Sequence, residues 1–209
     1  MPIRVQIVDS QRVVRRGLSM LLLTDSDIVI VGEAADGKEA LKIARQQQPD
    51  LILMELLFPD LSGNAIIEAL REQQPSVRIV ALSNSADYSL ITAAILAGVD
   101  TYLQKGSQPA LLTTIIKDVV AGRVILAPAL RVRVVNELPM PITAPPLTPD
   151  DLSVLKLLAA SRSDVEIAEA LHMTTDVVQT TVRHIQQKLS VPTRLLAVLR
   201  ATQLGFIEP

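Results

Sequence analysis

Cysteine and tryptophan are absent from this 209-residue chain, and aromatic side chains make up only 2% of it. Without cysteine the chain has no disulfide, no thiolate metal ligand and no cysteine nucleophile. With so few aromatic residues, Leu, Ile, Val and Ala must fill the core, and the hydrophobic fraction of 49% is large enough for this. The length allows one large domain or two small ones.

The chain also lacks an excess of positive charge and a long apolar run. Its formal net charge is −2, so no global field draws it to nucleic acid, although a local basic face would suffice for binding. No apolar stretch approaches the roughly 18 residues of a membrane span, and the first residues do not resemble a signal peptide. We expect a soluble cytoplasmic protein with no membrane partner.

Short apolar runs alternate with amphipathic stretches through residues 1–122. Most of the runs are continuous, as in parallel strands buried on both faces. The predicted strands are 3–8, 28–32, 51–54, 77–82 and 101–103. The predicted helices are 13–23, 37–46, 64–73, 86–97 and 109–121. Five such units predict an α/β domain with a doubly wound five-stranded parallel sheet, whose chemistry lies at the carboxyl ends of the strands.

The stretch 49–63, PDLILMELLFPDLSG, resembles the third strand and following loop of a two-component receiver domain. Receivers place a phosphoacceptor Asp at the tip of this strand, with Pro four residues and Gly eight residues further on. Pro59 and Gly63 fit this pattern, but position 55 is Glu. The resemblance covers the whole of residues 1–122 and identifies them as a CheY-like receiver domain with a degenerate phosphorylation site.

The resemblance also assigns roles to polar residues at the other strand ends. It implies that Asp9 is an acidic metal ligand, that Ser83 contacts the phosphoryl group and that Lys105 is the lysine of the pocket. Tyr102, three residues before that lysine, corresponds to a switch aromatic. Ser10 stands where the second residue of the usual acidic pair is expected.

The two departures, Glu55 and Ser10, both weaken phosphorylation. Ser10 offers Mg²⁺ a neutral hydroxyl instead of a carboxylate, and the longer Glu55 displaces the nucleophile, so positioning and electrostatic stabilisation both suffer. We expect no bound cofactor, with at most weak Mg²⁺ binding at Asp9 and Glu55. Glu55 can instead reach the ammonium of Lys105, where it either partly mimics a phosphoryl group or only holds the lysine.

Other acidic and hydroxyl residues near the pocket have alternative interpretations. Asp36, Asp60 and Asp87 are expected to be loop or helix-start residues. A minor hypothesis makes Asp60 or Ser83 the phosphoacceptor of an ordinary regulator, although neither lies at the tip of the strand.

Proline-rich residues 123–146 are expected to form a linker, with a short helix near 129–137. Beyond them, residues 147–209 contain only helical periodicity. The predicted helices are 150–160, 164–171, 175–189 and 193–205. The second and third have helix-turn-helix spacing. The motifs VLKLLA (154–159), EIAEAL (166–171) and Lys188-Leu189 resemble the LuxR-type DNA-binding domain of NarL/FixJ-type response regulators.

The third helix has two contrasting faces. Val178, Val182, Ile185 and Leu189 form one apolar stripe. On the opposite side, Gln179, Thr180 and Arg183 are expected to contact DNA bases in the major groove. Lys188 and Arg194 are expected to contact phosphates, and Thr174 is expected to cap the helix. His172 and His184 are expected to be surface or cap residues.

The small helical domain has few cations for a DNA-binding protein. Its seven acidic and six basic residues give a net charge of −1, and phosphate neutralisation supplies most DNA affinity. We therefore expect double-stranded DNA to be bound by a homodimer. The chain is interpreted as an atypical, phosphorylation-independent transcription factor and not an enzyme, with a histidine kinase or another protein as a further partner. The competing hypothesis is a protein-interaction regulator that has lost useful DNA binding.

Overall fold

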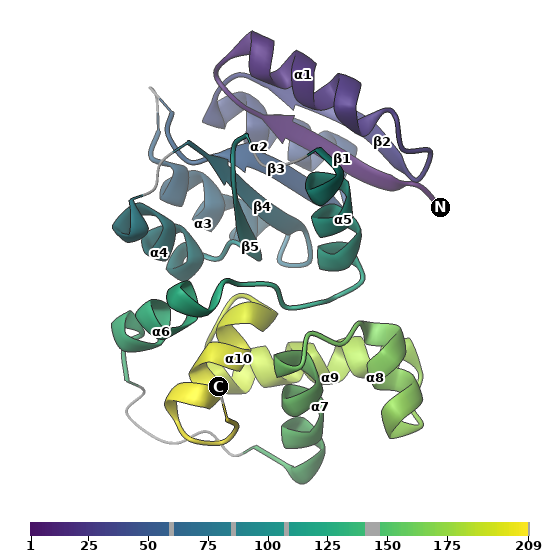
Figure 1. The fold of residues 1–209 in the computed structure, drawn as a ribbon, viewed down its shortest axis with the longest axis vertical. Helices are drawn as coiled ribbons and strands as arrows, with labels where there is room; N and C mark the ends of the chain where they lie inside the picture. Colours follow the sequence, from purple (N-terminus) through teal and green to yellow (C-terminus); the bar gives the residue numbers. More distant parts are fainter. Residues whose placement is uncertain (59–60, 85–86, 107–108, 141–146, 209) are drawn as a thin grey trace. The chain divides into compact units, whose positions relative to one another are not determined.

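The computed structural model describes residues 1–58, 61–84, 87–106, 109–140 and 147–208. The chain forms two compact units, Met1–Val120 and Ala121–Pro209 (Figure 1). Each unit has its own elements, strands and helices in the first and, among the described residues, helices alone in the second. Within the described residues, no helix has both the length and the hydropathy needed to span a membrane.

The first unit is built on a five-stranded parallel sheet. Its strands are β1 (Ile3–Val8), β2 (Ile28–Ala34), β3 (Leu51–Glu55), β4 (Arg78–Ser83) and β5 (Thr101–Gln104). Their order in the sheet is β2-β1-β3-β4-β5. The central strand β3 is buried along its whole length, which explains its continuous apolar sequence. The doubly wound parallel sheet predicted from the sequence is confirmed.

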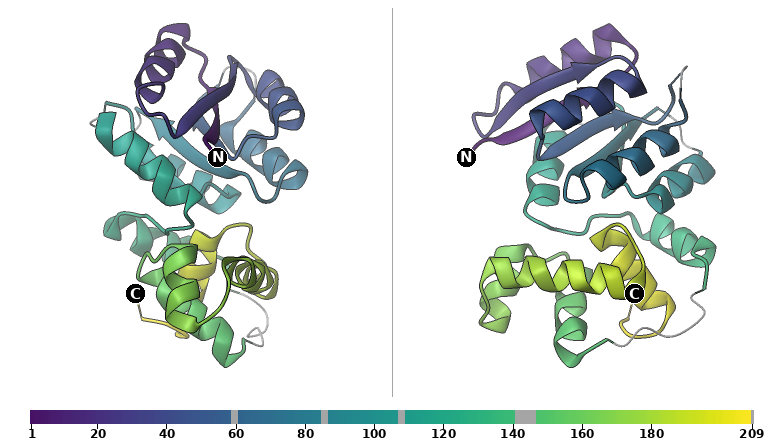
Figure 2. Two further views of the ribbon diagram at one scale, coloured as in Figure 1. Left: turned by 90° about the vertical axis from the view of Figure 1, so that its right-hand side faces the viewer. Right: turned by 180° about the vertical axis from the view of Figure 1, so that it is seen from behind.

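Helices cover both faces of this sheet (Figure 2). They are α1 (Arg12–Leu22), α2 (Gly37–Gln47), α3 (Gly63–Gln73), α4 (Tyr88–Ala97) and α5 (Pro109–Val120). The helices α2, α3 and α4 pack side by side on one face. On the other face, Lys117 of α5 bonds Asp27 after α1 at 2.8 Å. Because the helices cover the two faces of the sheet, the residues at the strand ends lie next to the loops that connect strands to helices.

Capping side chains explain where several helices begin. Asp36 accepts a hydrogen bond from the backbone of Glu39 at the start of α2, and Asp87 accepts one from Ser89 at the start of α4. These two are the helix-start residues that the sequence predicts. Pro59 and Asp60 lie outside the described residues, as does the predicted start of the fourth helix at Ala86.

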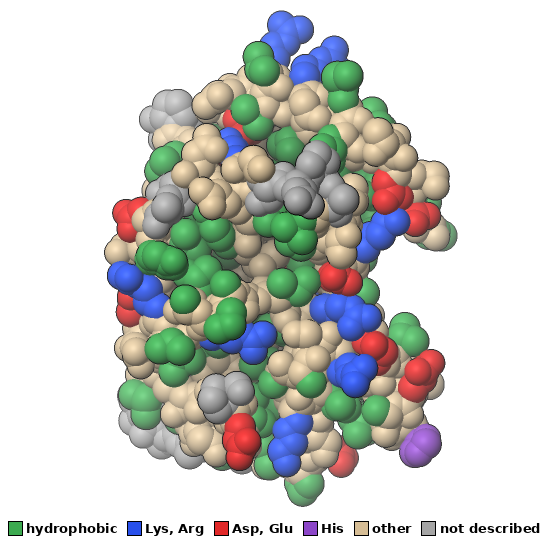
Figure 3. Space-filling model, viewed as in Figure 1, with side chains coloured by type: hydrophobic (Ala, Val, Ile, Leu, Met, Phe, Trp, Pro, Cys, Tyr) green, Lys and Arg blue, Asp and Glu red, His purple; other side chains and the backbone are tan. Residues whose placement is uncertain are grey.

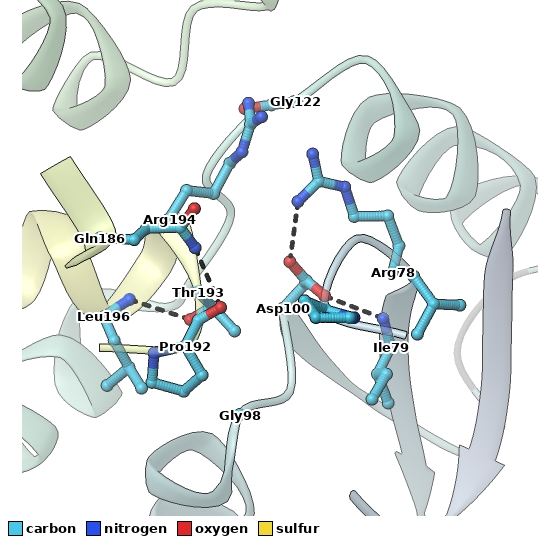
Figure 4. Close-up of polar contacts among 12 residues, drawn as sticks. Arg78, Ile79, Gly98, Asp100, Gly122, Gln186, Pro192, Thr193, Arg194 and Leu196 are labelled. Atoms are coloured by element: carbon cyan, nitrogen blue, oxygen red, sulfur yellow. Dashed lines mark hydrogen bonds and ion pairs between the residues drawn. The ribbon is translucent and has the colours of Figure 1, made fainter. Parts of the chain in front are cut away.

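A buried carboxylate fixes the amino-terminal ends of β4 and β5. Asp100 accepts a hydrogen bond from the backbone of Ile79 at 2.8 Å and pairs with Arg78 at 3.3 Å (Figure 4). Arg71 pairs with the same carboxylate at 2.6 Å. Burial raises the pKa of Asp100, but the two arginines outweigh it and the pKa is lowered. This cluster lies at the opposite ends of the strands from the predicted pocket.

The second unit is entirely helical in its described residues. Its helices are α6 (Pro128–Glu137), α7 (Pro149–Ala159), α8 (Asp164–Leu171), α9 (Thr175–Leu189) and α10 (Arg194–Gln203). The helices α7, α9 and α10 contact one another, and α8 packs on α9. Capping boxes begin α7 and α8, with Thr148 and Ser163 at the caps.

The described part of the segment expected to be a linker belongs to this second unit. The short helix predicted at 129–137 is present as α6, and it packs against α10. Residues 121–126 bond to the α7–α8 region. Residues 141–146 lie outside the described part of the chain. The described part of the segment is therefore docked and is not a free tether.

Candidate functional sites: the strand-end pocket and the recognition helix

The pocket residues gather at the carboxyl edge of the sheet because all five strands are parallel. Asp9 follows β1 directly, Glu55 ends β3, Ser83 ends β4 and Lys105 follows β5. Asp9, Glu55 and Ser83 are buried. The ladder continues to Lys105, whose backbone N–H donates to the Ser83 carbonyl at 3.0 Å. Backbone pairing thus sets the spacing of the side chains in this pocket.

Lys105 bridges the two carboxylates of the pocket. Its Nζ lies 2.6 Å from Glu55 Oε2 and 2.5 Å from Asp9 Oδ2. The lysine side chain is 10% exposed, and the carboxylates are 10% and 2% exposed. The contact between Glu55 and Lys105 that the sequence predicts is therefore present, and Asp9 shares the same ammonium.

The remaining carboxylate oxygens accept backbone hydrogen bonds. Glu55 Oε1 accepts from Leu56 N at 2.6 Å and from Leu57 N at 3.3 Å. Asp9 Oδ1 accepts from Gln11 N at 2.8 Å. Both oxygens of each carboxylate therefore have protein donors, as buried charges need.

The titration of the pocket follows from these contacts. Burial alone lowers the pKa of Lys105, but the hydrogen bonds and charges of Asp9 and Glu55 outweigh it, so the pKa is raised. Burial and the charge of Glu55 raise the pKa of Tyr102. The lysine therefore stays charged at neutral pH and the phenol stays neutral.

The donor set does not fit Mg²⁺ as it stands. The ion needs near-octahedral oxygen ligands at about 2.0–2.1 Å, but the Lys105 ammonium lies between the two carboxylates. Ser10 adds no charge and is exposed. Among the described residues, no group of three or more histidine, aspartate and glutamate side chains could hold a metal. A cation would have to displace the lysine first.

Tyr102 and Arg15 complete the surroundings of the pocket. The Tyr102 hydroxyl donates to the Ser83 carbonyl at 3.4 Å, so the ring is turned toward the pocket. Arg15 of α1 donates to the Asp9 carbonyl at 2.6 Å and lies 3.6 Å from Glu33. Sequence reasoning missed Arg15, because a basic residue on an amphipathic helix gives no signal that it turns back to a strand end.

In the second unit, α8 and α9 form the predicted helix-turn-helix. Thr174 caps α9 by accepting from Val177 N, as predicted. His172 ends α8 in the left-handed conformation and is exposed, and His184 is also exposed. Both histidines are therefore cap or surface residues, which confirms that prediction.

The two faces of α9 differ as the sequence predicts. The apolar stripe is buried, and the polar side chains opposite it are exposed. Arg183 Nη2 donates to Thr180 Oγ1 at 3.2 Å, and Arg183 Nε donates to the Gln179 carbonyl at 3.4 Å. Gln179, Thr180 and Arg183 thus lie together on one open surface, with hydrogen-bonding groups that can meet base edges.

Lys188 and Arg194 are both paired with carboxylates of other helices, Lys188 half-buried and Arg194 buried. Lys188 Nζ lies 2.6 Å from Asp151 Oδ2, whose carboxylate also caps α7. Arg194 is buried, reaches Gly122 (Figure 4) and bonds Asp164 Oδ1 at 2.7 Å. The expectation that Arg194 contacts phosphates is corrected, because its guanidinium is the partner of a buried carboxylate. Lys188 is already paired, although its side chain is 30% exposed.

Charges of both signs are mixed on the surface. On the face drawn in Figure 3, lysine and arginine side chains lie among aspartate and glutamate side chains. This agrees with the formal net charge of −2. Any attraction to nucleic acid must therefore be local.

Two family matches cover most of the chain. Residues 5–117 match the response regulator receiver domain, and residues 145–201 match the bacterial regulatory proteins of the luxR family. The response regulator protein VraR of Staphylococcus aureus is 34% identical over 209 residues, which is the full length of both proteins.

Solved structures resemble the chain in the same way. The response regulator ChrA of a heme-sensing two-component system is 28% identical, with a TM-score of 0.53 over 99% of each chain. A two-component response regulator of the LuxR family from Aurantimonas sp. SI85-9A1 is also 28% identical. Its TM-score is 0.59 over 66% of this chain and 98% of its own.

Proposed function

This chain belongs to the two-component response regulators of the LuxR family, and from that membership we propose that it is a transcription factor that works without phosphorylation of its receiver. Its C-terminal helix-turn-helix is a DNA-binding domain of this family. The finer proposal concerns the receiver. Phosphorylation needs a free acceptor carboxylate and a charged lysine that stabilises the product. In this chain the residues at these two positions, Glu55 and Lys105, already form an ion pair with each other.

The observation that carries this proposal is the placement of Lys105 between Glu55 and Asp9. The Glu55 carboxylate takes up the ammonium that would neutralise an incoming phosphoryl group. Its second oxygen is bonded to two backbone N–H groups at the strand tip. A phosphoryl donor would have to break these contacts before any oxygen of Glu55 could attack.

We further propose that Glu55 keeps the receiver in a single state. A carboxylate brings one charge and two oxygens, against about −1.5 to −2 charges and three oxygens for a phosphoryl group. Mimicry of phosphorylation is therefore partial, but the position of Lys105 no longer depends on a kinase. The receiver then serves as a scaffold for the DNA-binding domain.

We assign DNA recognition to Gln179, Thr180 and Arg183 of α9. These residues are exposed on one face, and their side chains carry the donors and acceptors that read base edges. One domain has few cations, so we propose a homodimer on two half-sites about one helical turn apart, acting in the cytoplasm.

The experiment that tests this function is selection of DNA sequences by the purified full-length protein, with and without acetyl phosphate. We expect the same sequences and the same affinity in both conditions. Selection of sequences only after acetyl phosphate treatment would contradict phosphorylation independence. If no selected sequence binds more tightly than random DNA at physiological salt, the protein-interaction regulator becomes the better explanation.

A further inference from the structure

The first turn of α9 contains an exposed apolar side chain. Every residue of α9 is described, and Val177 is its only large hydrophobic side chain that is exposed, at 46%. The other apolar residues of the helix are all buried, namely Val178, Val182, Ile185 and Leu189. Val177 lies outside this buried stripe, so the core does not require an apolar residue at this position.

The helix holds Val177 in a fixed place. It is the third residue of α9, and its backbone N–H donates to the side chain of the N-cap residue Thr174 at 3.4 Å. A β-branched side chain in a helix has one strongly preferred rotamer. The methyl groups of Val177 are therefore oriented before any ligand arrives, and a contact with them costs little side-chain entropy.

Val177 begins a row of side chains that continues with two of the residues assigned to DNA recognition. Thr180 and Arg183 follow it at intervals of three residues, and side chains three residues apart on a helix are neighbours. All three are exposed. Arg183 Nη2 donates to Thr180 Oγ1 at 3.2 Å. The row is therefore apolar at the Val177 end and cationic at the Arg183 end.

The small size of this apolar surface limits what can cover it. Val177 lies among exposed polar neighbours, namely Asp176, Thr180 and His184. A protein partner needs a continuous apolar patch, and one valine among polar side chains does not provide it. A single methyl group is a matching ligand, and the C5 methyl of thymine is the apolar group that a base pair presents in the major groove.

We propose that Val177 determines DNA sequence specificity beside Arg183, by packing against the C5 methyl group of a thymine in the major groove. This inference rests on the proposed DNA-binding function, because it needs the first turns of α9 to lie at the base edges. The contact removes apolar surface of both groups from water, which is favourable. Cytosine lacks this methyl group, so the contact favours a T·A pair over a C·G pair.

The rise of the helix between the two residues sets the position of the thymine. Arg183 is the sixth residue after Val177, and a helix rises about 1.5 Å per residue, so the two lie about 9 Å apart along the axis. Successive base pairs are about 3.4 Å apart. We therefore expect the thymine about two or three base pairs from the pair that Arg183 contacts.

The test replaces thymine by uracil, which has the same hydrogen-bonding groups but no C5 methyl. The full-length protein first selects its DNA sequence. Each thymine of both strands is then replaced in turn, and the dissociation constant is measured by fluorescence anisotropy. At one position of each half-site, in the expected window, uracil should weaken binding by about fourfold, as expected for one buried methyl group. In Val177→Ala the same replacement should have no effect.

The matched control is Val165→Ala, because Val165 of α8 is also an exposed valine of the helix-turn-helix, at 56%. The first helix of this motif crosses the DNA backbone, so the control should keep the fourfold penalty for uracil. Alanine has a higher helix propensity than valine, so both variants should fold as the native chain does.

The outcomes separate this inference from the proposed function. Selected DNA that shows no uracil penalty in the expected window would overturn the inference and leave DNA recognition intact. An equal penalty in the native chain and in Val177→Ala would overturn it as well, because another residue would then contact the methyl group. If no sequence is selected over random DNA, the proposed function fails and the inference fails with it.

Discussion

The strand-end pocket and the recognition helix use their polar groups in opposite ways. In the pocket, Lys105, Asp9 and Glu55 are nearly buried and bond one another. On α9, Gln179 and Arg183 are exposed, and their contacts are with their own helix. The charged groups of the pocket bond one another and stabilise the receiver. The polar side chains of α9 are exposed, so their hydrogen-bonding groups are accessible to a ligand.

This difference lies in the contacts of the side chains and not in the positions that the two families give them. Both sites lie where their family places them, and the fold positions them equally well. The local chemistry separates them, because Glu55 is bonded to Lys105 in the pocket whereas the polar side chains of α9 are exposed. Variants that remove the ion pairs of the pocket, or the exposed polar side chains Gln179, Thr180 and Arg183 of α9, therefore test the two sites independently.

The largest effect is expected from Lys105→Ala. It leaves two nearly buried carboxylates without their cation, which costs about 3–5 kcal/mol in the free energy of unfolding. The measurement is tyrosine fluorescence during chemical denaturation. The chain has no tryptophan, and its two tyrosines, Tyr88 and Tyr102, both lie in the receiver.

The control for this variant is Lys42→Ala, an exposed lysine on α2. A loss as small as that of the control would show that the pocket charges are solvated. The pKa of Lys105 is raised, so the stability it gives is complete below its unfolded pKa of about 10.4 and is lost as the pH rises through the higher folded value. The native receiver should therefore weaken in strong alkali, and Lys105→Ala should remove that dependence.

The second-largest effect concerns the exposed polar side chains Gln179, Thr180 and Arg183 of α9. Arg183→Ala should weaken binding to the selected DNA by about 1–3 kcal/mol and relax one base position, because a bidentate contact is lost. Lys188→Ala should weaken all sequences alike and by less, since Lys188 is already paired with Asp151. Competition binding against single-base variants of the selected site measures both. Equal loss of specificity in the two variants would contradict the assignment.

A smaller effect is expected in acid, in the second unit. Hydrogen bonds from the backbone and side chain of Ser163, with the nearby Arg123, lower the pKa of Glu166 from 4.5 to about 2. A depressed pKa gives stability that is complete above the unfolded value and is lost as the pH falls through the folded one. Helical circular dichroism should therefore show destabilisation between pH 4.5 and 2.

The acid effect has a matched control on the same helix. Glu166→Gln should reduce the pH dependence of unfolding in this range, whereas Glu169→Gln, an exposed residue of α8, should leave it unchanged. An unaltered pH dependence in Glu166→Gln would show that the capping box does not hold the charged carboxylate.

The sequence was sufficient for the architecture because local signals and the fold agree. Strand β1 and helices α8 and α9 have the predicted bounds, and Thr174 caps α9. The largest difference among the strands is in β2, which continues past Gly32 to Ala34. Parallel pairing with β1 carries it on to Glu33 and Ala34, and spacing along one strand cannot reveal that pairing.

The side-chain partners were harder to predict than the elements. The approach of Glu55 to Lys105 follows because the carboxyl ends of β3 and β5, on either side of β4, lie on the same edge of a parallel sheet, so the sequence contains it. The partners of Lys188 and Arg194 come from other helices, and the angles at which helices pack decide them. For the same reason, nothing in the proline-rich pattern of residues 123–146 indicated that α6 docks on α10.

The smallest expected effect is none at all: incubation with acetyl phosphate and Mg²⁺ should leave the intact mass of the protein unchanged. Glu55 is bonded to Lys105 and to two backbone N–H groups, so neither oxygen is placed for attack. Glu55→Asp alone should gain little label, because Asp9 still holds the lysine and Ser10 still lacks the charge to attract a metal. Glu55→Asp with Ser10→Asp should gain more, since both missing carboxylates are then restored. One stable phosphoryl group on the native receiver would show that the ion pairs of the pocket open to the donor. The polar groups of the pocket would then be as accessible to a ligand as those of α9.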